Sequence, residues 1–397
     1  MQRGLISCIL ILSFVSPCLC FTRLNFGLET KESTYNVLDY GANGDGKSDN
    51  ENAFLSAWND ACGTEGNATL VIPKGNVFML KNLQLNGPCK ANSIHIQLYG
   101  DIVAASMDEW GNDKLHLITI SNVTSLTIDG GGSIDGNGKT WWEACRDCQR
   151  PSILYFYGCK DISVSSLNVA NSPGFHVPIN CSENLRFSNV NITAPGDSHN
   201  TDGFDLWNTK NVVFEDSVIS VGDDCIAIKA QCSYINVTRL TCGPGHGISI
   251  GSLGVDQNYE TAEEIHVKNC TFKGVTNGAR IKTWEGAPGY ARKISFENII
   301  LIDAENPIII DQHYGTKHPN NNSVSMPVSD ITYRGFEGTC AKQKAINLNC
   351  TINGCYNITL DQINIVSSDP KKKAQAFTIN AHGKVHNVIP HVSGMLE

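Results

Sequence analysis

The feature that most constrains the fold is a short apolar–polar–apolar triplet that recurs along the chain from residue 120 onward. Alternation of this kind predicts short β-strands with one face turned inward. Consecutive copies are mostly 23 to 30 residues apart, and the longer steps leave room for inserted loops. The copies are Leu126–Ile128, Ile162–Val164, Leu185–Phe187, Val212–Phe214, Ile235–Val237, Ile265–Val267, Ile294–Phe296, Ile331–Tyr333 and Ile358–Leu360.

A strand repeat of this length cannot bury its own apolar face, so it must stack on its neighbours. A parallel β-helix and a β-propeller both meet that need, but propeller blades are about 40 to 50 residues long. The shorter steps favour the β-helix. Long helical patterns between the strands are absent, which argues against a doubly wound α/β fold. We therefore predict an all-β parallel β-helix.

The N-terminal part of the chain departs from the repeat. In the segment 49–61, Ala53, Phe54, Ala57, Trp58 and Ala61 fall at helical spacing. Ser48 or Asp49 precedes them as a candidate N-cap. We expect this helix to cap the open end of the stack, whose strand edges otherwise invite pairing with another chain.

Residues 1–20 have the pattern of a secretory signal peptide. A positive start at Met1–Arg3 precedes an apolar run, Leu5–Val15, that is too short to span a bilayer. The alternative is a buried N-terminal strand. We predict one β-helical catalytic domain over 21–397, with no later membrane span. The net charge of −9 argues against a nucleic-acid partner.

Cysteines and sequons agree with secretion to the extracellular space or cell wall. Sixteen cysteines are present, three of them within residues 1–20, and the odd remainder of thirteen leaves at least one thiol outside any internal disulfide. Cys145 and Cys148 have C-x-x-C spacing but no second such pair, so we expect no zinc. N-x-S/T sequons begin at Asn67, Asn122, Asn180, Asn191, Asn236, Asn269, Asn321, Asn349 and Asn357, although repeated Asn-x-Thr also arises from strand composition.

Polar residues able to carry chemistry gather in the middle repeats. Asp223 lies eleven residues after Val212, and His246 lies eleven after Ile235. Equal offsets on successive coils predict that the two side chains are neighbours, roughly 4.8 Å apart along the stack. Asp202 falls on the preceding coil, and Asp224 adjoins Asp223. Arg280 and Lys282 follow on the next coil. The offsets of Asp202 and Arg280 differ from that of Asp223, so the alignment of both with Asp223 is a hypothesis.

Stacked carboxylates raise the pKa of at least one member, and glycoside hydrolysis needs one protonated and one ionised carboxyl. Arg280 and Lys282 offer positive charge for an acidic sugar. Taken singly, Asp-Asp is often an Asx turn, Gly-His-Gly is often structural, and Arg-x-Lys is often a solvated strand face. A calcium site is the chemical rival, since acidic clusters bind hard cations, but the basic side chains nearby oppose it.

These residues resemble the four signature segments of the polygalacturonases, glycoside hydrolase family 28. The segments are Asn200–Asp202, Gly222–Asp224, Gly245–Gly247 and Arg280–Lys282, with further similarity at Gly247–Gly254, Gln312–Tyr314 and Asp39–Ala42. The resemblance implies a right-handed, pectin-lyase-like parallel β-helix that hydrolyses pectin with inversion. It implies no metal or organic cofactor, a polysaccharide partner and a monomer.

By matched position, the resemblance implies a role for each residue. Asp223 is the expected general acid, with His246 to orient or tune it. Asp202 and Asp224 are expected to hold and deprotonate the attacking water. Arg280 and Lys282 are expected to bind the galacturonate carboxylate. Further implied features are substrate contacts at Asn200 and Tyr314 and a disulfide between Cys225 and Cys242.

Two positions depart from the pattern of many plant relatives, where proline precedes Asn-Thr-Asp and cysteine follows the tyrosine. Here these residues are His199 and Gly315. Three alternatives stay open: calcium-dependent lyase chemistry, hydrolysis of rhamnogalacturonan or xylogalacturonan, and a non-catalytic pectin-binding protein. Endo or exo action depends on loops such as 256–262 and 286–290, which the sequence does not place.

Overall fold

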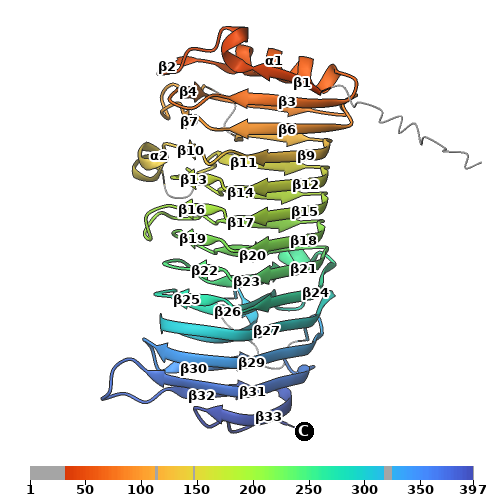
Figure 1. Cartoon of the computed structure of the whole chain (residues 1–397). Coiled ribbons are helices and arrows are strands. Elements are labelled where there is room, and N and C mark those ends of the chain that lie inside the picture. Colours follow the sequence, from red (N-terminus) through yellow and green to blue (C-terminus); the bar gives the residue numbers. More distant parts are fainter. Residues whose placement is uncertain (1–31, 112–114, 146–147, 317–323, 397) are drawn as a thin grey trace, which may run out of the picture. The chain divides into compact units, whose positions relative to one another are not determined.

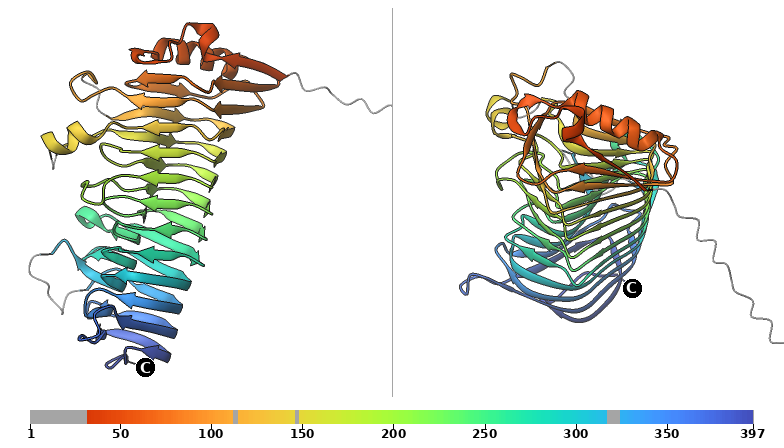
Figure 2. Two further views of the ribbon diagram at one scale, coloured as in Figure 1. Left: turned by 60° about the vertical axis from the view of Figure 1, so that its left-hand side comes forward. Right: turned by 45° about the horizontal axis from the view of Figure 1, so that its top comes forward.

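The computed structural model describes residues 32–111, 115–145, 148–316 and 324–396. Within them the strands pair in parallel and stack coil upon coil from the red to the blue end of the chain (Figures 1 and 2). The predicted parallel β-helix is therefore confirmed. The predicted signal peptide at 1–20 and the sequon at Asn321 lie outside the described residues.

Three stacks of parallel strands form the coils. The first stack contains β1 (Glu32–Asn36), β3 (Asn67–Ile72), β6 (Ser93–Leu98), β9 (Thr124–Asp129), β12 (Lys160–Ser165), β15 (Glu183–Ser188), β18 (Lys210–Glu215), β21 (Cys232–Thr238), β24 (Glu260–Lys268), β27 (Gly289–Ala304), β29 (Val328–Cys340), β31 (Cys355–Ser367) and β33 (Ala381–Ile389). The second stack contains β2 (Asp45–Asp49), β4 (Val77–Leu80), β7 (Asp101–Ala104), β10 (Ser133–Asp135), β13 (Asn168–Ala170), β16 (Asn191–Thr193), β19 (Val218–Ser220), β22 (Thr241–Cys242) and β25 (Thr271–Lys273). The two stacks merge at β27, which pairs with both β24 and β25.

The third stack forms a separate sheet and carries the candidate site. It contains β5 (Leu83–Asn86), β8 (His116–Ser121), β11 (Ser152–Tyr157), β14 (Val177–Asn180), β17 (Phe204–Trp207), β20 (Ile226–Ile228), β23 (Ile248–Leu253), β26 (Asn277–Trp284), β28 (Asn306–Tyr314), β30 (Lys344–Asn349) and β32 (Gln375–Ile379). The short helices are η1 (Val37–Tyr40), α1 (Glu51–Gly63), α2 (Lys139–Ala144) and η2 (Val255–Gln257).

The recurring triplets pair with one another along the first stack and so define its register. Leu126 pairs with Ile162, Ile162 with Leu185, and Leu185 with Val212. The same column continues through Ile235, Ile265, Ile294, Ile331 and Ile358. Every triplet thus occupies the same place on successive coils, as its spacing predicts.

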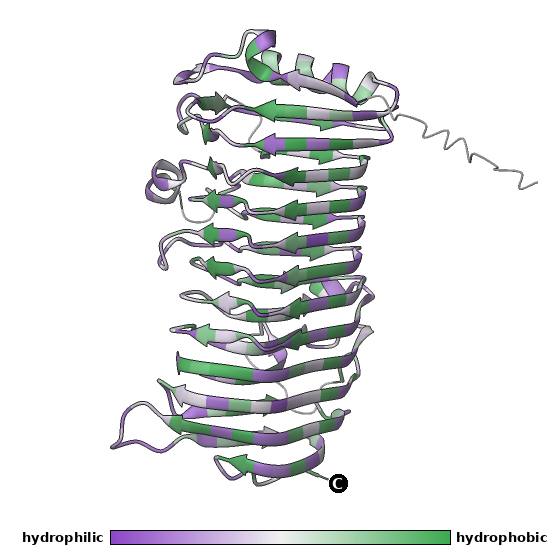
Figure 3. Cartoon of the chain, in the orientation of Figure 1, coloured by the Kyte–Doolittle hydropathy of each residue, from purple (hydrophilic) through white to green (hydrophobic). Residues whose placement is uncertain are grey.

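Alternation along each strand divides core from surface. Figure 3 shows apolar and polar residues alternating along many of the strands. The inward residues fill the coil with buried aliphatic and aromatic side chains, among them Phe187, Phe204 and Phe214, whose rings lie within 5.4 Å of one another. This stacked core fixes the height of each coil and therefore the height of each polar loop attached to it.

The residue before each triplet has a positive φ, which Asn and Asp tolerate best. Asn184 (φ 60°) and Asn211 (φ 57°) are examples, and the side chain of Asn211 donates to that of Asn184 at 3.1 Å. The sequon residue Asn357 (φ 51°) takes the same position and donates to Asp330. Asparagine is therefore frequent in this column for a structural reason.

The predicted N-terminal helix is confirmed as α1, and all of its predicted apolar residues are buried. Figure 1 shows α1 over β1 and β3 at the end of the stack, and Trp58 Nε1 donates to the carbonyl of Asn86 at the end of β5. The predicted N-cap is wrong, because Ser48 and Asp49 belong to β2 and the helix begins after Asn50. Asp49 still accepts from the first helical N–H, that of Glu51, at 3.0 Å.

Within the part of the chain that the structure describes, disulfides join Cys62 to Cys89, Cys225 to Cys242, and Cys350 to Cys355. The pairing of Cys225 with Cys242 is confirmed. Buried thiols outside these bonds include Cys159, Cys232, Cys270 and Cys340, which agrees with the odd cysteine count. Among the described residues, no helix combines the length and the apolar character that crossing a bilayer requires.

Candidate active site

The candidate catalytic residues lie at or just before the starts of neighbouring strands in the third stack. Asp202 precedes β17, Asp223 and Asp224 precede β20, and His246 precedes β23. The backbone N–H of Gly203 donates to the carbonyl of Asp224 at 2.9 Å, so Asp202 and Asp224 occupy adjacent rungs. The structure therefore gathers in one place residues that are far apart in the sequence.

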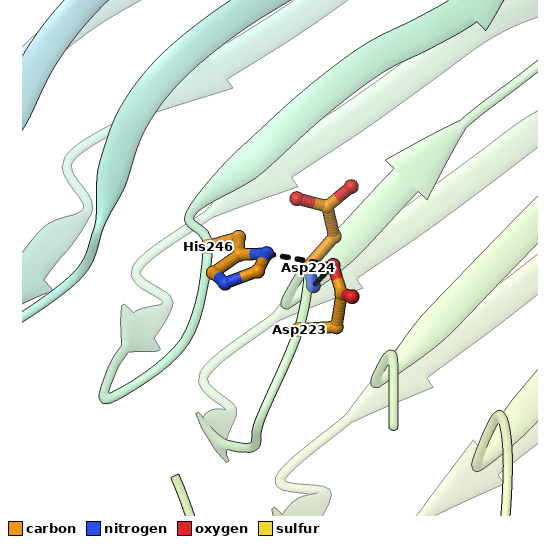
Figure 4. A group of neighbouring side chains, drawn as sticks. All are labelled: Asp223, Asp224 and His246. Carbon is orange, nitrogen blue, oxygen red and sulfur yellow. Dashed lines mark hydrogen bonds and ion pairs between the residues drawn. The ribbon is translucent and has the colours of Figure 1, made fainter. Parts of the chain in front are cut away.

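Asp223 and His246 are in direct contact, as their equal offsets predict. Nδ1 of His246 lies 2.8 Å from Oδ1 of Asp223, and Figure 4 shows the imidazole directed at that carboxylate. The backbone N–H of His246 also donates to the carbonyl of Asp223 at 2.7 Å. Glycine suits the next position, Gly247, because it has φ 78° and a Cβ there would lie 2.1 Å from the carbonyl oxygen of Asn277 on the following coil.

Asp224 is held between two cations contributed by β26. Its Oδ1 accepts from Arg280 Nη2 at 2.7 Å, and its Oδ2 accepts from Lys282 Nζ at 2.9 Å. The hydroxyl of Ser249 on β23 is the third donor to this carboxylate, and it donates to Oδ1 at 2.8 Å. Burial alone raises the pKa of this carboxyl, but the charges of Arg280 and Lys282 outweigh burial and lower its pKa to about 2. Asp224 is therefore ionised at any ordinary pH.

Asp223, Asp224 and His246 also lie close enough to hold a metal ion, with ligand atoms within 4.8 Å of one another. The donor set fits a cation poorly. Both oxygens of Asp224 already face Arg280 and Lys282, whose positive charges repel a metal at this position. The geometry thus favours an anionic or neutral occupant over calcium.

The pKa of Asp202 is shifted in the opposite direction from that of Asp224. Its side chain is 5 % exposed, and burial is the main cause that raises its pKa well above the ordinary value. The negative charges of Asp205 and Asp223 raise it further, while Lys229 opposes them. The pKa values of Asp202 and Asp224 are therefore driven apart, so that Asp202 holds a proton far more readily than Asp224 does.

Sequence reasoning did not assign roles to Asp205 and Lys229, which form a buried ion pair beside Asp202. Lys229 Nζ lies 2.6 Å from Oδ1 of Asp205, a fully buried residue, and stands over the rings of Trp207 and Phe175 at 4.4 and 4.8 Å. Strand alternation was the available signal, since Lys229 follows the buried run 226–228 and must point outward. His176, which contacts the carbonyl of Asp202, was also missed.

Of the two predicted substrate contacts, Tyr314 lies beside the cations of the site, whereas Asn200 lies in an exposed turn. Tyr314 ends β28, and its ring lies 5.2 Å from Lys282 Nζ, so it belongs to the cationic end of the site. Asn200 is exposed in the turn before β17 with φ 52°. Over the described ranges, no hydrogen bond joins the Asn200 side chain to the acidic cluster.

The structure accounts for one of the two unusual positions. The backbone carbonyl of His199 accepts a hydrogen bond from Arg150, but proline has the same carbonyl, so nothing in the structure explains the histidine. Gly315 has φ 74°, and a Cβ there would lie 2.6 Å from the ring of Trp284, so glycine suits this site. The segments 256–262 and 286–290 lie together, since Glu260 pairs with Gly289 and Thr261 with Tyr290 where β24 and β27 begin.

Comparison with known proteins identifies the family of the chain. The family model for glycosyl hydrolases family 28 matches residues 62–385. A probable polygalacturonase of Arabidopsis thaliana is 39% identical over 379 residues, which are 92% of this chain and 83% of that protein. Polygalacturonase-2 of Solanum lycopersicum is 36% identical over 373 residues, 91% of this chain and 81% of that protein.

Solved structures share the fold. The endo-xylogalacturonan hydrolase of Aspergillus tubingensis superposes with a TM-score of 0.76 and 25% identity, covering 92% of this chain and 100% of that one. A polygalacturonase of Erwinia carotovora superposes with a TM-score of 0.68 and 23% identity, covering 88% of this chain and 96% of that one. Matched across most of its length in sequence and fold, the chain belongs to glycosyl hydrolases family 28, the polygalacturonase family of pectin-degrading enzymes.

Proposed function

We propose that the protein hydrolyses the α-1,4-galacturonosyl linkages of polygalacturonate with inversion at the anomeric carbon. The observation that carries this proposal is the Asp223–Asp224 pair, in which one carboxylate faces His246 and the other faces Arg280 and Lys282. Relatives named polygalacturonases at 36% to 39% identity support the same substrate class.

Asp223 is the proposed general acid. It gives its proton to the glycosidic oxygen, so the departing sugar leaves as a neutral alcohol. His246 is a positioning residue, because its imidazole fixes the carboxyl of Asp223 through the 2.8 Å contact. The tautomer of His246 decides which of the two groups donates in that contact.

Asp224 and Asp202 are proposed to share the attacking water on the opposite face of the sugar. Asp224 stays ionised and orients the water. Asp202 accepts its proton, because a carboxylate with a raised pKa is the stronger base once it has ionised. The oxygen of the water forms the new bond to the anomeric carbon while the old glycosidic bond breaks.

Arg280 and Lys282 are proposed to bind the substrate carboxylate as well as Asp224. Their side chains keep 13% and 8% of their surface exposed, so each reaches the solvent boundary of the site. Charge-assisted hydrogen bonds from Arg and Lys are strong in a partly buried site. Tyr314, beside Lys282, is the proposed wall of this carboxylate pocket, and Asn200 is a proposed contact at its rim.

The test is incubation of the purified protein with polygalacturonate, with and without a chelator. The proposal predicts new reducing ends, no ultraviolet absorption from unsaturated products, and the same rate in EDTA. Unsaturated products that disappear with EDTA would instead establish a lyase. A size profile over time then distinguishes monomer release, which means exo action, from mixed oligomers, which mean endo action.

A substituted pectin is a second candidate substrate, favoured by the superposition on the endo-xylogalacturonan hydrolase at 25% identity. Parallel assays on polygalacturonate, xylogalacturonan and rhamnogalacturonan decide between them. Binding of oligogalacturonides with no cleavage of any of the three would indicate a non-catalytic protein.

We also propose that the enzyme acts outside the cell as a monomer. Disulfides such as Cys62–Cys89, Cys225–Cys242 and Cys350–Cys355 persist in an oxidising compartment. Recovery of activity in the cell-wall fraction supports this location, and light scattering of the purified protein gives its oligomeric state.

A further inference from the structure

A hollow of about 980 Å³ lies on the outside of the C-terminal coils, where the first and second stacks merge. Buried apolar side chains form its floor, among them Phe336 and Ile363. Two aliphatic side chains at its walls face water, Ile300 with 55% and Ile389 with 56% of its surface exposed. The hollow therefore leaves apolar surface in contact with water, which an occupant would shield.

The rim of the hollow is polar. Glu337 and Asn364 contribute exposed polar side chains to it. The turns between the two stacks add a column of amide side chains at positive φ, which are Asn269, Asn298, Gln362 and Asn387. A sugar presents both apolar faces and hydroxyls, so an apolar floor with a polar rim suits a carbohydrate.

Asn269 is also the first residue of an N-x-S/T sequon, which ends at Thr271. Its side chain is exposed, and its Oδ1 accepts a hydrogen bond from Nδ2 of Asn298 at 3.1 Å. Its own Nδ2, the atom to which a glycan is joined, donates to no other residue that the structure describes. At Asn357, by contrast, Nδ2 donates to Oδ1 of Asp330 at 2.7 Å. The fold thus leaves the amide nitrogen of Asn269 open to carry a sugar.

The geometry of an amide decides on which side of Asn269 such a sugar lies. A sugar on Nδ2 makes a secondary amide, and in the favoured trans form the group on the nitrogen lies on the same side as the oxygen. Oδ1 of Asn269 faces Asn298 on the following coil, so the sugar is directed toward that coil. Ile300 belongs to the same coil and pairs with Thr271, roughly 4.8 Å away along the stack. The first sugar therefore starts at the apolar wall of the hollow.

We propose that Asn269 is N-glycosylated and that the first sugars of the glycan lie in the hollow. The apolar face and the N-acetyl group of N-acetylglucosamine cover Ile300, and the hydroxyls face the polar rim at Glu337 and Asn364. In the transfer step, Nδ2 bonds to C1 of the first sugar and loses a proton, while the bond from C1 to the phosphate of a lipid-linked oligosaccharide donor breaks. The inference rests on the proposed extracellular location, because this donor is met in the secretory pathway.

A glycan at this position leaves the candidate active site open. Asn269 lies in the turn from β24 to β25, which belong to the first and second stacks. The catalytic residues Asp202, Asp223 and Asp224 precede strands of the third stack. The glycan therefore acts on the stability and the surface of the C-terminal coils and not on turnover.

The experiment secretes the full chain from a eukaryotic host and maps its glycopeptides by mass spectrometry, before and after treatment with a peptide N-glycosidase. Most molecules are expected to carry a glycan at Asn269, which the glycosidase converts to aspartate. Thr271→Ser keeps the sequon and should keep the glycan, whereas Thr271→Val lacks the hydroxyl and should lose it. Secreted wild type with an unmodified Asn269 would overturn the proposal.

Comparison of these two variants measures whether the glycan covers the hollow. Thr271→Val should bind more of an apolar fluorescent dye than Thr271→Ser and should unfold at a Tm about 2 °C lower. Its kcat and KM on polygalacturonate should match those of Thr271→Ser. Thr359→Val is the matched control, because it removes the sequon at Asn357 and adds the same apolar side chain on β31, and it should bind dye as wild type does. Equal dye binding by the two Thr271 variants would overturn the covering of the hollow.

Failure of the proposed location is distinguishable from failure of the glycan. If the chain stays inside the host cell, the location fails. Residues 21–397 are then secreted behind a signal peptide of the host and mapped in the same way. A glycan at Asn269 of that protein supports the modification site, and an unmodified Asn269 overturns it.

Discussion

Oδ1 of the fully buried Asp205 lies 2.6 Å from Nζ of Lys229, and this pair adjoins the candidate base Asp202. The two charges act on Asp202 in opposite directions. Asp205 raises the pKa of Asp202, after burial the largest cause, whereas Lys229 lowers it. Burial raises the pKa of Asp202 most, and the two charges of the pair then adjust the pH at which Asp202 becomes ionised.

Substitutions in this pair should move the acid limb of the pH profile in opposite directions. Asp205→Asn removes a negative charge, so the pKa of Asp202 falls and the acid limb of kcat/KM shifts to lower pH by roughly one unit. Lys229→Met removes the opposing positive charge, so the limb shifts to higher pH. The measurement is kcat/KM on polygalacturonate across the acid range.

Asp216→Asn is the control for that series, because Asp216 pairs with Arg239 at 2.6 Å on the exterior of the first stack. Its profile should match wild type. Shifts of the same sign in Asp205→Asn and Lys229→Met would exclude Asp202 as the titrating base.

His176 should make stability depend on pH. Its imidazole is fully buried, and burial lowers its pKa to about 4, below the ordinary value near 6.5. Between these values the unfolded chain binds a proton that the folded chain does not, so stability is lost as the pH falls. The loss approaches about 3 kcal/mol by pH 4. Urea unfolding at several pH values should show a smaller loss for His176→Asn, and equal slopes would contradict this origin.

Lys282 should be needed for activity more than for folding. Lys282→Met removes one of two cations from Asp224, so the pKa of Asp224 rises and one anchor for the substrate carboxylate is lost. We expect kcat/KM to fall about 100-fold, the scale of losing one electrostatic donor. Lys268→Met, whose pair with Glu297 is exposed, should change neither activity nor stability beyond about 0.5 kcal/mol. Comparable activity in both variants would refute the role of Lys282.

Much of the fold follows from the sequence because, in a β-helix, residues at equal distances from the repeated triplet lie side by side on successive coils. The triplets mark the register, so equal offsets brought Asp223 and His246 together without any tertiary information. The offsets of Asp202 and Arg280 differ because their turns differ in length. Their positions next to Asp224 became visible only in the structure, through a backbone hydrogen bond at Gly203 and a side-chain hydrogen bond from Arg280.

Other features depend on contacts that no single segment encodes. Lys229 looks like an ordinary lysine at a strand end until the coil below supplies Asp205 and the ring of Trp207. The helix start was misplaced for a similar reason. Ser48 and Asp49 are good capping residues, but pairing of β2 with β4 holds them in a strand and the helix starts after Asn50.

The most direct measurement is the rate of reducing-end release from polygalacturonate by wild type, Asp223→Asn and Asp129→Asn. Asp129 is the matched control, since it contacts His95 at 2.8 Å in the first stack, the same distance as between Asp223 and His246. With all three proteins folded, the account predicts a loss of about 100-fold to 10,000-fold for Asp223→Asn and a wild-type rate for Asp129→Asn. Equal rates in all three would contradict Asp223 as the general acid.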